Sequence, residues 1–385
     1  MSTQHADVFK GGTVVAVADV GNASAGVAIF VLKRHAPAHL LLAARQYVPL
    51  GRTEATLEAL YTECGAVIEQ IAKEYAVKFP GGKRVQAVHL IVHSPWIRSK
   101  TVRMESVFAD ETIVRGGMIS SLARSILAQE HEYEHAEIVE KSIIRTEVNG
   151  YVTKKPEGKR GNSLAVSALL SACDVSLRGR LEDMVLLSFG VHPVIHSGAA
   201  VLNALVAQGI CVEDATVVDM TGESTCITSI RSGLIVGEQI VPEGVHSIVR
   251  RVAGTGLPEE TLALIRMVSD GRGDDAACEA VKTAMSNSEP ELARLFGEPC
   301  ATLAAKRRLP NQLYLLTHPD LMPWFTQFFS RIDFAQCTLT LQPYTVLPLT
   351  ARVFDAAITL SSPSMQDSGL LADGILVNSS MQDEI

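Results

Sequence analysis

Paired cysteines, blocks of basic residues and an N-terminal hydrophobic segment are all missing from this sequence. None of the seven cysteines stands in a Cys-x-x-Cys pair, and their scattered spacing favours free thiols in a reducing compartment over disulfides or a zinc site. No run of lysine or arginine is long enough to follow a nucleic-acid backbone, and the formal net charge is −8. Residues 1–12 lack the apolar stretch of a signal peptide. We therefore expect a cytoplasmic protein that does not use nucleic acid as its main partner.

A membrane-spanning helix is not expected either. Residues 184–212 contain no charged side chain and are long enough to cross a bilayer. Gly190 and Pro193 interrupt this segment, which favours a strand at 190–195 followed by a helix at 197–208. The composition, 47% hydrophobic and 20% charged, is typical of a globular protein, and 385 residues suit two domains or one large protein with two lobes.

Two segments that lie far apart in the sequence share one strand–turn–strand pattern. In residues 13–33 an apolar strand ends on Asp19, and a turn of small residues leads into a second apolar strand. In residues 217–241 an apolar strand ends on Asp219, and a turn of threonine and glycine leads into two further strands. The separation of the two segments is too long for a solenoid repeat. It predicts two similar domains in one chain.

Both turns contain the residue types that bind phosphate. Backbone N–H groups in turns of Gly, Ser and Thr are unshielded, and the neighbouring hydroxyl groups can donate to phosphate oxygens. Carboxylates placed like those of Asp19 and Asp219 can hold Mg²⁺ through its bound water. The pattern therefore predicts a phosphate site between the two halves of the chain, although a single such turn is also typical of an ordinary hairpin.

The remaining segments predict an α/β protein with an inserted unit. The insertion has a strand–helix–strand–strand–helix pattern and contains Asn149-Gly150, the strongest hairpin signal in the sequence. Helical spacing dominates beyond the second hairpin, with a break expected at 286–288. The predicted plan is a first domain at 1–96 with 188–212, an inserted α+β subdomain at 97–187, a second domain at 213–360 that includes a helical subdomain at 243–309, and a surface tail at 361–385.

Over residues 13–360 the chain resembles the bacterial actin-like proteins of the FtsA and PilM type. The run Asp19-Val20-Gly21-Asn22 with Ser24 is similar to their first phosphate motif, and Asp219-Met220-Thr221-Gly222 with Ser224-Thr225 is similar to the second. The insertion is similar to their small SHS2-like subdomain. The resemblance implies an α/β fold of two actin-like, ribonuclease H-like domains around a central cleft, with the insertion in the first domain.

The same resemblance implies a nucleotide site and a role. ATP and Mg²⁺ would be the cofactors, Asp19 and Asp219 would hold Mg²⁺ through water, and the function would be that of a cytoplasmic adaptor or scaffold, peripheral to the inner membrane through its partner. The partner would be a cytoplasmic segment of an inner-membrane protein or a component of the division or pilus machinery, with self-association as a further option. The implied nucleotide-binding residues are Asp19, Gly21, Asn22, Ser24, Asp219, Thr221, Gly222, Ser224 and Thr225.

The sequence departs from this pattern in the nucleotide motifs. Glu223 stands where the second motif usually has glycine, and a carboxylate about 4 Å from a phosphate would cost on the order of 4 kcal/mol at an effective dielectric constant near 20. The adenosine motif falls on the turn 317–320, which has a proline and no glycine. Hydrolysis is therefore expected to be weak or absent, and nucleotide binding stays open.

The end of the chain departs from the FtsA type in particular. Residues 379–385 contain Asp383 and Glu384 but no basic residue, whereas a membrane-binding amphipathic helix would be basic. This favours a PilM-like scaffold.

Two alternatives to the adaptor remain. A phosphotransferase of the related sugar-kinase class would need a carboxylate as general base, for which Glu223 and Asp214 are the candidates. A nucleotide-free scaffold with an actin-like fold is the other. No catalytic residue is assigned, since no Ser/His/Asp or Cys/His set has a diagnostic spacing. The H-E-x-x-H match at 131–135 lies in a glutamate-rich run without a third ligand, so a metalloprotease is not favoured.

Overall fold

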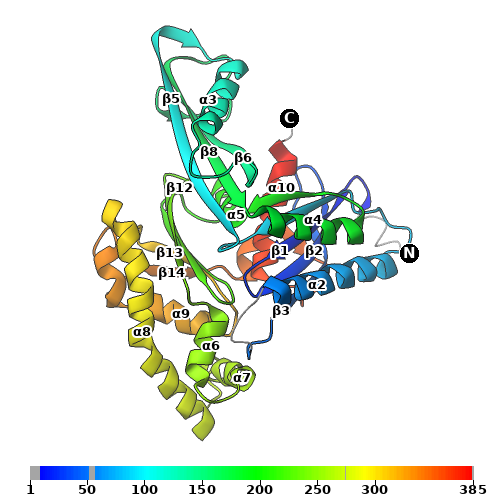
Figure 1. The fold of residues 1–385 in the computed structure, drawn as a ribbon, viewed down its shortest axis with the longest axis vertical. Helices are drawn as coiled ribbons and strands as arrows, with labels where there is room; N and C mark the ends of the chain where they lie inside the picture. The colour runs from blue at the N-terminus through cyan, green and yellow to red at the C-terminus, as the bar shows by residue number, and fades with distance from the viewer. Residues whose placement is uncertain (1–8, 52–56, 274, 384–385) are drawn as a thin grey trace.

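A computed structural model describes residues 9–51, 57–273 and 275–383 of the chain. The described residues form three β-sheets with helices packed on their faces (Figure 1). Two of the sheets belong to the two predicted α/β domains, and the third belongs to the inserted segment.

The first domain is built on a six-stranded sheet with the strand order β15-β3-β2-β1-β4-β9. Strands β1, β2 and β3 are antiparallel neighbours, whereas β4 runs parallel to β1 and β9 runs parallel to β4. The short strand β15, from the far end of the chain, pairs in parallel with β3. The strands are β1 (Thr13–Val20), β2 (Ser24–Leu32), β3 (Ala38–Tyr47), β4 (Ala87–Val92), β9 (Pro193–Ser197) and β15 (Ile358–Leu360).

The second domain repeats this topology in a five-stranded sheet with the order β12-β11-β10-β13-β14. Strands β10, β11 and β12 are antiparallel neighbours, and β13 and β14 follow in parallel. The strands are β10 (Ala215–Met220), β11 (Thr225–Arg231), β12 (Leu234–Val241), β13 (Gln312–Leu316) and β14 (Thr345–Pro348). The repeat of three antiparallel strands followed by two parallel ones agrees with the two similar domains expected from the sequence.

Strand β1 is apolar on both faces because helices cover both sides of its sheet. Val14 and Ala16 pack into one buried cluster with α2 (Leu57–Lys78) and α4 (Val175–Phe189). Val15 and Val17 pack into another with α5 (Gly198–Ala207) and α10 (Ser368–Asp383). Successive residues of a strand point to opposite faces, so an unbroken apolar run is what a doubly covered strand requires.

The inserted segment forms its own sheet, which projects from the rest of the molecule (Figure 1). The strand order is β5-β8-β6-β7, and α3 (Gly116–Ala128) packs on the sheet through a small apolar cluster. Helix α4, which the sequence analysis assigned to this block, packs instead against α2 of the first domain. The strands are β5 (Ile97–Ile113), β6 (Ile138–Val148), β7 (Tyr151–Val152) and β8 (Arg160–Cys173).

The helical part of the second domain differs from the prediction at one point. The expected break at 286–288 does not occur, and α8 (Ala276–Lys306) runs through both Pro290 and Pro299. Buried side chains continue along its length, and Phe296 lies within 6.1 Å of Phe325 between ring centroids. This packing offsets the backbone hydrogen bonds that proline cannot donate. The other helices are α6 (Val245–Ala253), α7 (Pro258–Ser269) and α9 (Met322–Phe329), and two 3-10 helices span Ile332–Cys337 and Ala351–Phe354.

The expectation of a surface tail at 361–385 is wrong for α10. Leu370, Leu371 and Ile375 of this helix are at most 1% exposed and pack against β1, β2 and α5. The tail was predicted from its content of Ser, Asp and Gly. The same segment also has apolar residues at a helical spacing, which is typical of a helix with a buried face.

The uncharged segment 184–212 is folded as predicted, into the end of α4, strand β9 and helix α5. Within the described ranges, no helix combines the length and the hydropathy needed to cross a membrane.

Candidate functional site

The two predicted turns meet between the domains. Asn22, in the β1–β2 turn, donates from Nδ2 to Ser224 Oγ at 3.1 Å and accepts from the backbone N–H of Glu223 through Oδ1 at 2.6 Å. A Cβ placed on Gly222 would lie 2.2 Å from Ala23 Cβ, so only glycine allows the turns to approach this closely. The side chain of Asn22 thus holds the second turn against the first, and we call these two hydrogen bonds the Asn22 clasp.

A cleft of about 280 Å³ opens beside this contact. Ligand pockets usually measure about 300 to 1,000 Å³, so the cleft is slightly below that range. Six of the nine predicted nucleotide-binding residues line it, namely Asp19, Gly21, Ser24, Asp219, Thr221 and Gly222. The other three do not. Asn22 and Ser224 are held between the turns, and Thr225 is fully buried, with its hydroxyl group donating to the carbonyl of Glu243 at 2.7 Å.

The turn proposed for the adenosine motif lies at the same cleft. Thr317, His318 and Pro319 line it, whereas Asp320 pairs with Arg266 at 2.7 Å. The ring of Tyr47 lies edge-on to His318, with 5.9 Å between the ring centroids. The fold therefore brings the three predicted motifs into one place, because β1 and β10 each lie beside a parallel strand whose carboxyl end faces the cleft.

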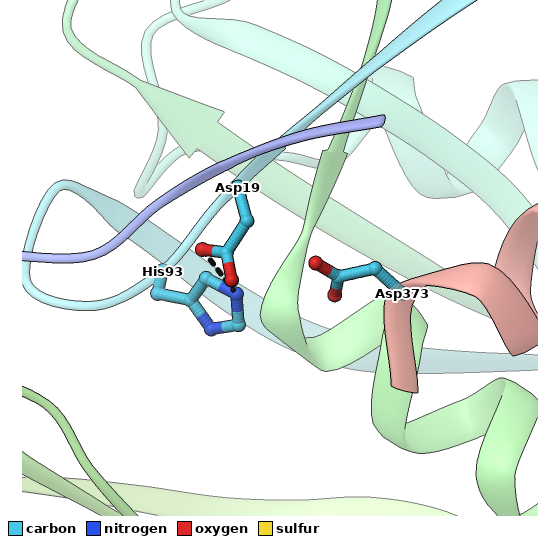
Figure 2. A group of neighbouring side chains, drawn as sticks. All are labelled: Asp19, His93 and Asp373. Atoms are coloured by element: carbon cyan, nitrogen blue, oxygen red, sulfur yellow. Dashed lines mark ion pairs between the residues drawn. The ribbon is translucent and has the colours of Figure 1, made fainter. Parts of the chain in front are cut away.

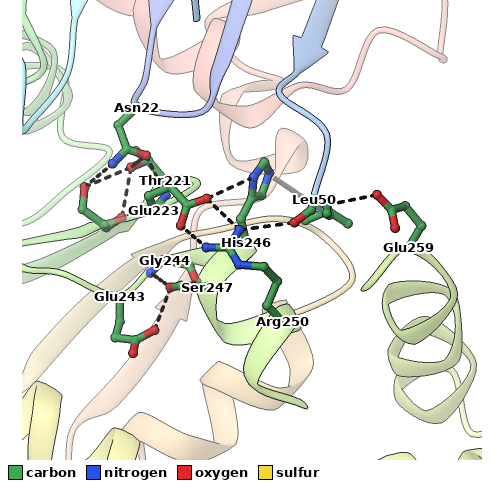
Figure 3. A network of polar contacts seen from close by, with 12 residues as sticks. Asn22, Leu50, Thr221, Glu223, Glu243, Gly244, His246, Ser247, Arg250 and Glu259 are labelled. Atoms are coloured by element: carbon green, nitrogen blue, oxygen red, sulfur yellow. Dashed lines mark hydrogen bonds and ion pairs between the residues drawn. The ribbon is translucent and has the colours of Figure 1, made fainter. Parts of the chain in front are cut away.

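Glu223 does not have the environment that the sequence analysis expected. Its carboxylate turns away from the cleft toward α6, where Arg250 contacts both of its oxygens at 2.8 and 2.5 Å (Figure 3). Helix α6 is anchored on the same turn, since the N–H of Val245 donates to the carbonyl of Thr221 at 2.8 Å. Arg250 lies 27 positions after Glu223 in the sequence. Arg250 was missed because the helix, and not the local sequence, brings it there.

Arg45 is a second residue that the sequence analysis missed. It comes from β3 and donates through Nη2 to Asp19 Oδ2 at 2.5 Å and through Nε to Asp367 Oδ2 at 2.6 Å. It also donates to the hydroxyl group of Ser24 at 3.2 Å. Burial favours the neutral acid at Asp367, but the adjacent Arg45 outweighs it and holds the pKa of that carboxyl below its usual value.

His93 bridges the two aspartates that were predicted to hold Mg²⁺. Its Nε2 lies 3.4 Å from Asp19 Oδ1, and its Nδ1 lies 3.3 Å from Asp219 Oδ2. Burial alone would lower the pKa of His93, but the carboxylates of Asp19 and Asp219 outweigh it and raise the pKa to about 10. The signal was present in the sequence, because His93 directly follows β4, which lies parallel to β1 and ends beside Asp19.

Asp373 lies next to this pair and was not predicted at all. It is fully buried on α10, and neither of its carboxylate oxygens has a hydrogen-bond partner. Burial and the charge of Asp19 raise its pKa well above the usual value. Figure 2 shows Asp19, His93 and Asp373 facing one another from three different segments of the first domain.

The side chains in this cleft do not fit Mg²⁺ and a nucleotide phosphate as the sequence analysis placed them. Arg45 and His93 already lie on the carboxylates of Asp19 and Asp219. The side chain of Asn22 spans the gap between the turns, and it takes the N–H of Glu223 that a phosphate oxygen would use. Protein groups thus take the positions expected for the phosphate and for a Mg²⁺ ion held through water between Asp19 and Asp219.

Comparison with solved structures agrees with the repeated sheet topology. A chain of the PilM–PilN type IV pilus biogenesis complex superposes with a TM-score of 0.56 at 13% identity, covering 96% of this chain and 98% of that one. The fold is that of the actin-like ATPases. Two domains surround a cleft in this actin-like chain, as the sequence analysis predicted. Whether the insertion is an SHS2 subdomain stays a prediction.

Two further structures are more distant. The ethanolamine utilization protein EutJ from Carboxydothermus hydrogenoformans has a TM-score of 0.41 at 13% identity, with 95% of this chain and 89% of that one covered. A Bacteroides thetaiotaomicron protein with an actin-like ATPase fold and unknown function has a TM-score of 0.37 at 9% identity, with 96% and 98% covered. No family model matches this chain. No curated protein matches it either.

Proposed function

We propose that this protein is an actin-like scaffold that binds a segment of a partner protein and whose domains are joined by side-chain contacts in place of Mg²⁺ and ATP. Its role is that of an adaptor for a membrane-associated machine, such as a pilus, secretion or division assembly. It would act in the cytoplasm and reach the inner membrane through its partner. The fold supports this proposal, since the superposed chain with the TM-score of 0.56 comes from a pilus biogenesis complex.

The contact between the two turns carries the nucleotide-independent part of the proposal. Asn22 satisfies Glu223 N–H and Ser224 Oγ, which are groups that a phosphate would otherwise engage. Arg45 supplies a positive charge to Asp19, and a hydrogen-bonded cation pair of this kind is stronger than a neutral hydrogen bond. The Arg45–Asp19 pair lies within the first domain, and the contacts of Asn22 link the two domains without any bound group.

The two candidate general bases of the phosphotransferase alternative both have other partners. Glu223 pairs with Arg250, and Asp214 accepts from the N–H of Ser232 at 3.0 Å in the β11–β12 turn region. Neither of these described residues lines the cleft. A general base must lie within hydrogen-bond reach of the hydroxyl group that it deprotonates, so this arrangement does not favour the reaction.

The outer end of the inserted sheet is the surface that we propose for the partner. Val107 of β5 is 77% exposed, and Tyr151 and Val152 of β7 are 79% and 56% exposed. They lie at the same end of the sheet, because Val107 pairs with Ser163 on β8 and Tyr151 pairs with Val148 on β6. Strands β5 and β7 are the two edges of this sheet, and an exposed apolar side chain beside an open strand edge suits an apolar partner segment that adds to the sheet.

The first experiment is a thermal-shift titration of the purified protein with Mg-ATP. A ligand at 100 times its dissociation constant would add about 2.7 kcal/mol to the free energy of unfolding, which is easily measured. We expect no change in Tm at millimolar Mg-ATP. A clear, saturable increase would show that nucleotide binds and would overturn the nucleotide-independent part of the proposal.

The second experiment tests the partner surface. The protein is used to screen an array of cytoplasmic segments from inner-membrane pilus, secretion and division proteins. The variant Val107→Lys should lose the segment that the wild type binds, whereas Val77→Lys, at an equally exposed valine on α2, should keep it. Loss of binding in both variants, or in neither, would place the partner elsewhere. Failure of every segment to bind would overturn the adaptor role.

A further inference from the structure

We infer that Asp19, His93 and Asp373 form a binding site for a divalent transition-metal ion of the zinc type, with Asp219 orienting the histidine ring. The three side chains come from the end of β1, the residue after β4, and α10. One donor atom of each lies within 4.8 Å of the others (Figure 2). This site differs from the water-mediated Mg²⁺ site predicted from the sequence, since Asp219 is not a ligand and the contacts are direct.

Unpartnered polar atoms mark the centre of the cluster. Both carboxylate oxygens of Asp373 are buried and have no hydrogen-bond partner. Asp19 Oδ1 and His93 Nε2 are also buried without a hydrogen bond, and their contact is the ion pair that they form with each other at 3.4 Å. A buried polar atom without a partner costs free energy, so several of them facing one point require an explanation. A bound cation satisfies all of them at once. Asp373 is decisive here, because it is fully buried, neither of its oxygens has a hydrogen-bond partner, and its carboxylate group faces Asp19 and His93 (Figure 2).

The other polar atoms of His93 and Asp19 contact neighbouring residues, and these contacts leave one atom of each side chain facing the proposed ion. His93 Nδ1 hydrogen-bonds with Asp219, which orients the ring so that Nε2 faces the other two ligands. The ion would displace the proton on Nε2, because a histidine binds a metal as neutral imidazole. A carboxylate on the far nitrogen of a metal-binding histidine is a common arrangement in proteins. Arg45 similarly takes Oδ2 of Asp19 and leaves Oδ1. Gly198 leaves room for the ring in this position, since a Cβ there would lie 2.8 Å from His93 Nδ1.

The donor set favours zinc or a similar ion over magnesium. One imidazole nitrogen and two carboxylate oxygens suit Zn²⁺, whereas Mg²⁺ prefers oxygen ligands and retained water. Two ligand atoms about 2.1 Å from a tetrahedral ion lie about 3.4 Å apart. The separation of His93 Nε2 and Asp19 Oδ1 is 3.4 Å. The charges of two carboxylates also balance a divalent ion.

The site has room for one more ligand. A small cavity of about 40 Å³ lies beside it and is lined by His93, Asp219 and Asp373 among other residues. A water molecule needs at least about 10 to 15 Å³ measured in this way, so water can complete the coordination. Because His93 also holds Asp219 of the second domain, the ion would strengthen the link between the two domains.

Metal binding is tested on untagged protein stripped with a chelator and then titrated with Zn²⁺ or Co²⁺ in the absence of nucleotide and partner. We expect one ion per chain, a higher Tm, and a Co²⁺ absorption spectrum typical of nitrogen and oxygen ligands. Asp373→Asn and His93→Gln should each lower the affinity for the metal at least about 10-fold. Loss of a residue that only supports a metal ligand already lowers metal affinity by about this factor. His131→Gln, in the exposed H-E-x-x-H segment, is the matched control and should bind like the wild type.

Each outcome decides the proposal. Stoichiometric binding that is lost in Asp373→Asn and His93→Gln, but kept in His131→Gln, supports it. Absence of stoichiometric binding, or binding that depends on His131 and not on Asp373, overturns it. Folding is controlled by circular dichroism of the stripped proteins, and stripped Asp373→Asn should be at least as stable as the stripped wild type because an unpartnered buried carboxylate has been removed. A result in either direction leaves the scaffold proposal untouched, since no nucleotide or partner is present.

Discussion

The guanidinium group of Arg250 spans the carboxylate of Glu223, with Nη1 at 2.8 Å from Oε1 and Nη2 at 2.5 Å from Oε2. This two-point ion pair joins the turn after β10 to helix α6. The glutamate that replaces a glycine of the resembled motif therefore has a structural partner. It stabilises the turn and does not project into the cleft.

Replacing Glu223 by alanine should lower the free energy of unfolding by about 1–3 kcal/mol, because the half-buried guanidinium group of Arg250 would lose a charged partner. Urea unfolding of the purified variant measures this. Glu298→Ala is the control, since its pair with Arg294 is exposed to solvent and should contribute little to stability. Equal effects of the two substitutions would contradict the structural role of Glu223.

The Asn22 clasp between the two domains leads to a second prediction. Asn22→Ala should lower the free energy of unfolding by about 1–3 kcal/mol, because it leaves the N–H of Glu223 without its acceptor inside the contact. Hydrogen exchange of the two turns should also become faster. Asn311→Ala is the control and should have a smaller effect. The amide that it removes is solvent-accessible, so water can replace the hydrogen bonds with Gln342 and Thr340. Unchanged exchange at the turns of the Asn22 variant would show that the clasp does not hold the domains.

Helix α10 gives a third prediction about the residues expected to form a tail. Leu370→Ala should lower the free energy of unfolding by about 2–5 kcal/mol, since the side chain is completely buried between the sheet and α5. Leu187→Ala, at a leucine that is 86% exposed, should change it by less than about 0.5 kcal/mol. Calorimetric or urea unfolding of both variants makes the comparison. Similar stability of the two variants would place α10 outside the core.

Glu238 gives a prediction about pH. Its carboxyl group lines the small cavity, where burial outweighs a hydrogen bond with Thr228 and raises the pKa from 4.5 to about 7. The unfolded chain binds fewer protons than the folded one between these values, so this group lowers stability as the pH rises from about 4.5 to about 7. Glu238→Gln should therefore add about 1–3 kcal/mol at pH 8 and less than about 0.5 kcal/mol at pH 4.5.

The measurement for Glu238 is urea unfolding of both proteins at the two pH values, with a chelator present so that metal binding does not contribute. A gain that is the same at both pH values would contradict the raised pKa. A loss at pH 8 would show that the charged carboxylate has a partner in solution.

Local patterns in the sequence were sufficient to predict much of the fold. The paired hairpins around Asp19 and Asp219 identified two similar domains, and the repeated sheet topology confirms this. The Asn149-Gly150 hairpin was predicted from residue type, and both residues have the positive φ angles, 52° and 78°, that such a turn needs. The continuous helix α8 was not predictable in this way. Its course past Pro290 is fixed by aromatic side chains that come from α9.

The candidate site was predictable only in part. The turns carry their residues in consecutive positions, so their meeting at a cleft could be expected from two short motifs. Arg45, His93 and Asp373 lie on separate elements, and their grouping around Asp19 depends on the order of the strands and on the burial of α10. The partner of Glu223 was missed for the same reason, because Arg250 reaches it only when α6 is in place.

The contribution of β15 and α10 to the first domain affects how the protein can be made. Residues 358–360 extend the edge of the first sheet at β3, and α10 fills the space beneath β1 and β2. An emerging nascent chain can form its N-terminal strands early, but their core stays incomplete until the whole second domain has been translated. During that interval apolar strand faces remain open to solvent, so the first domain needs protection during synthesis although it is the first to leave the ribosome.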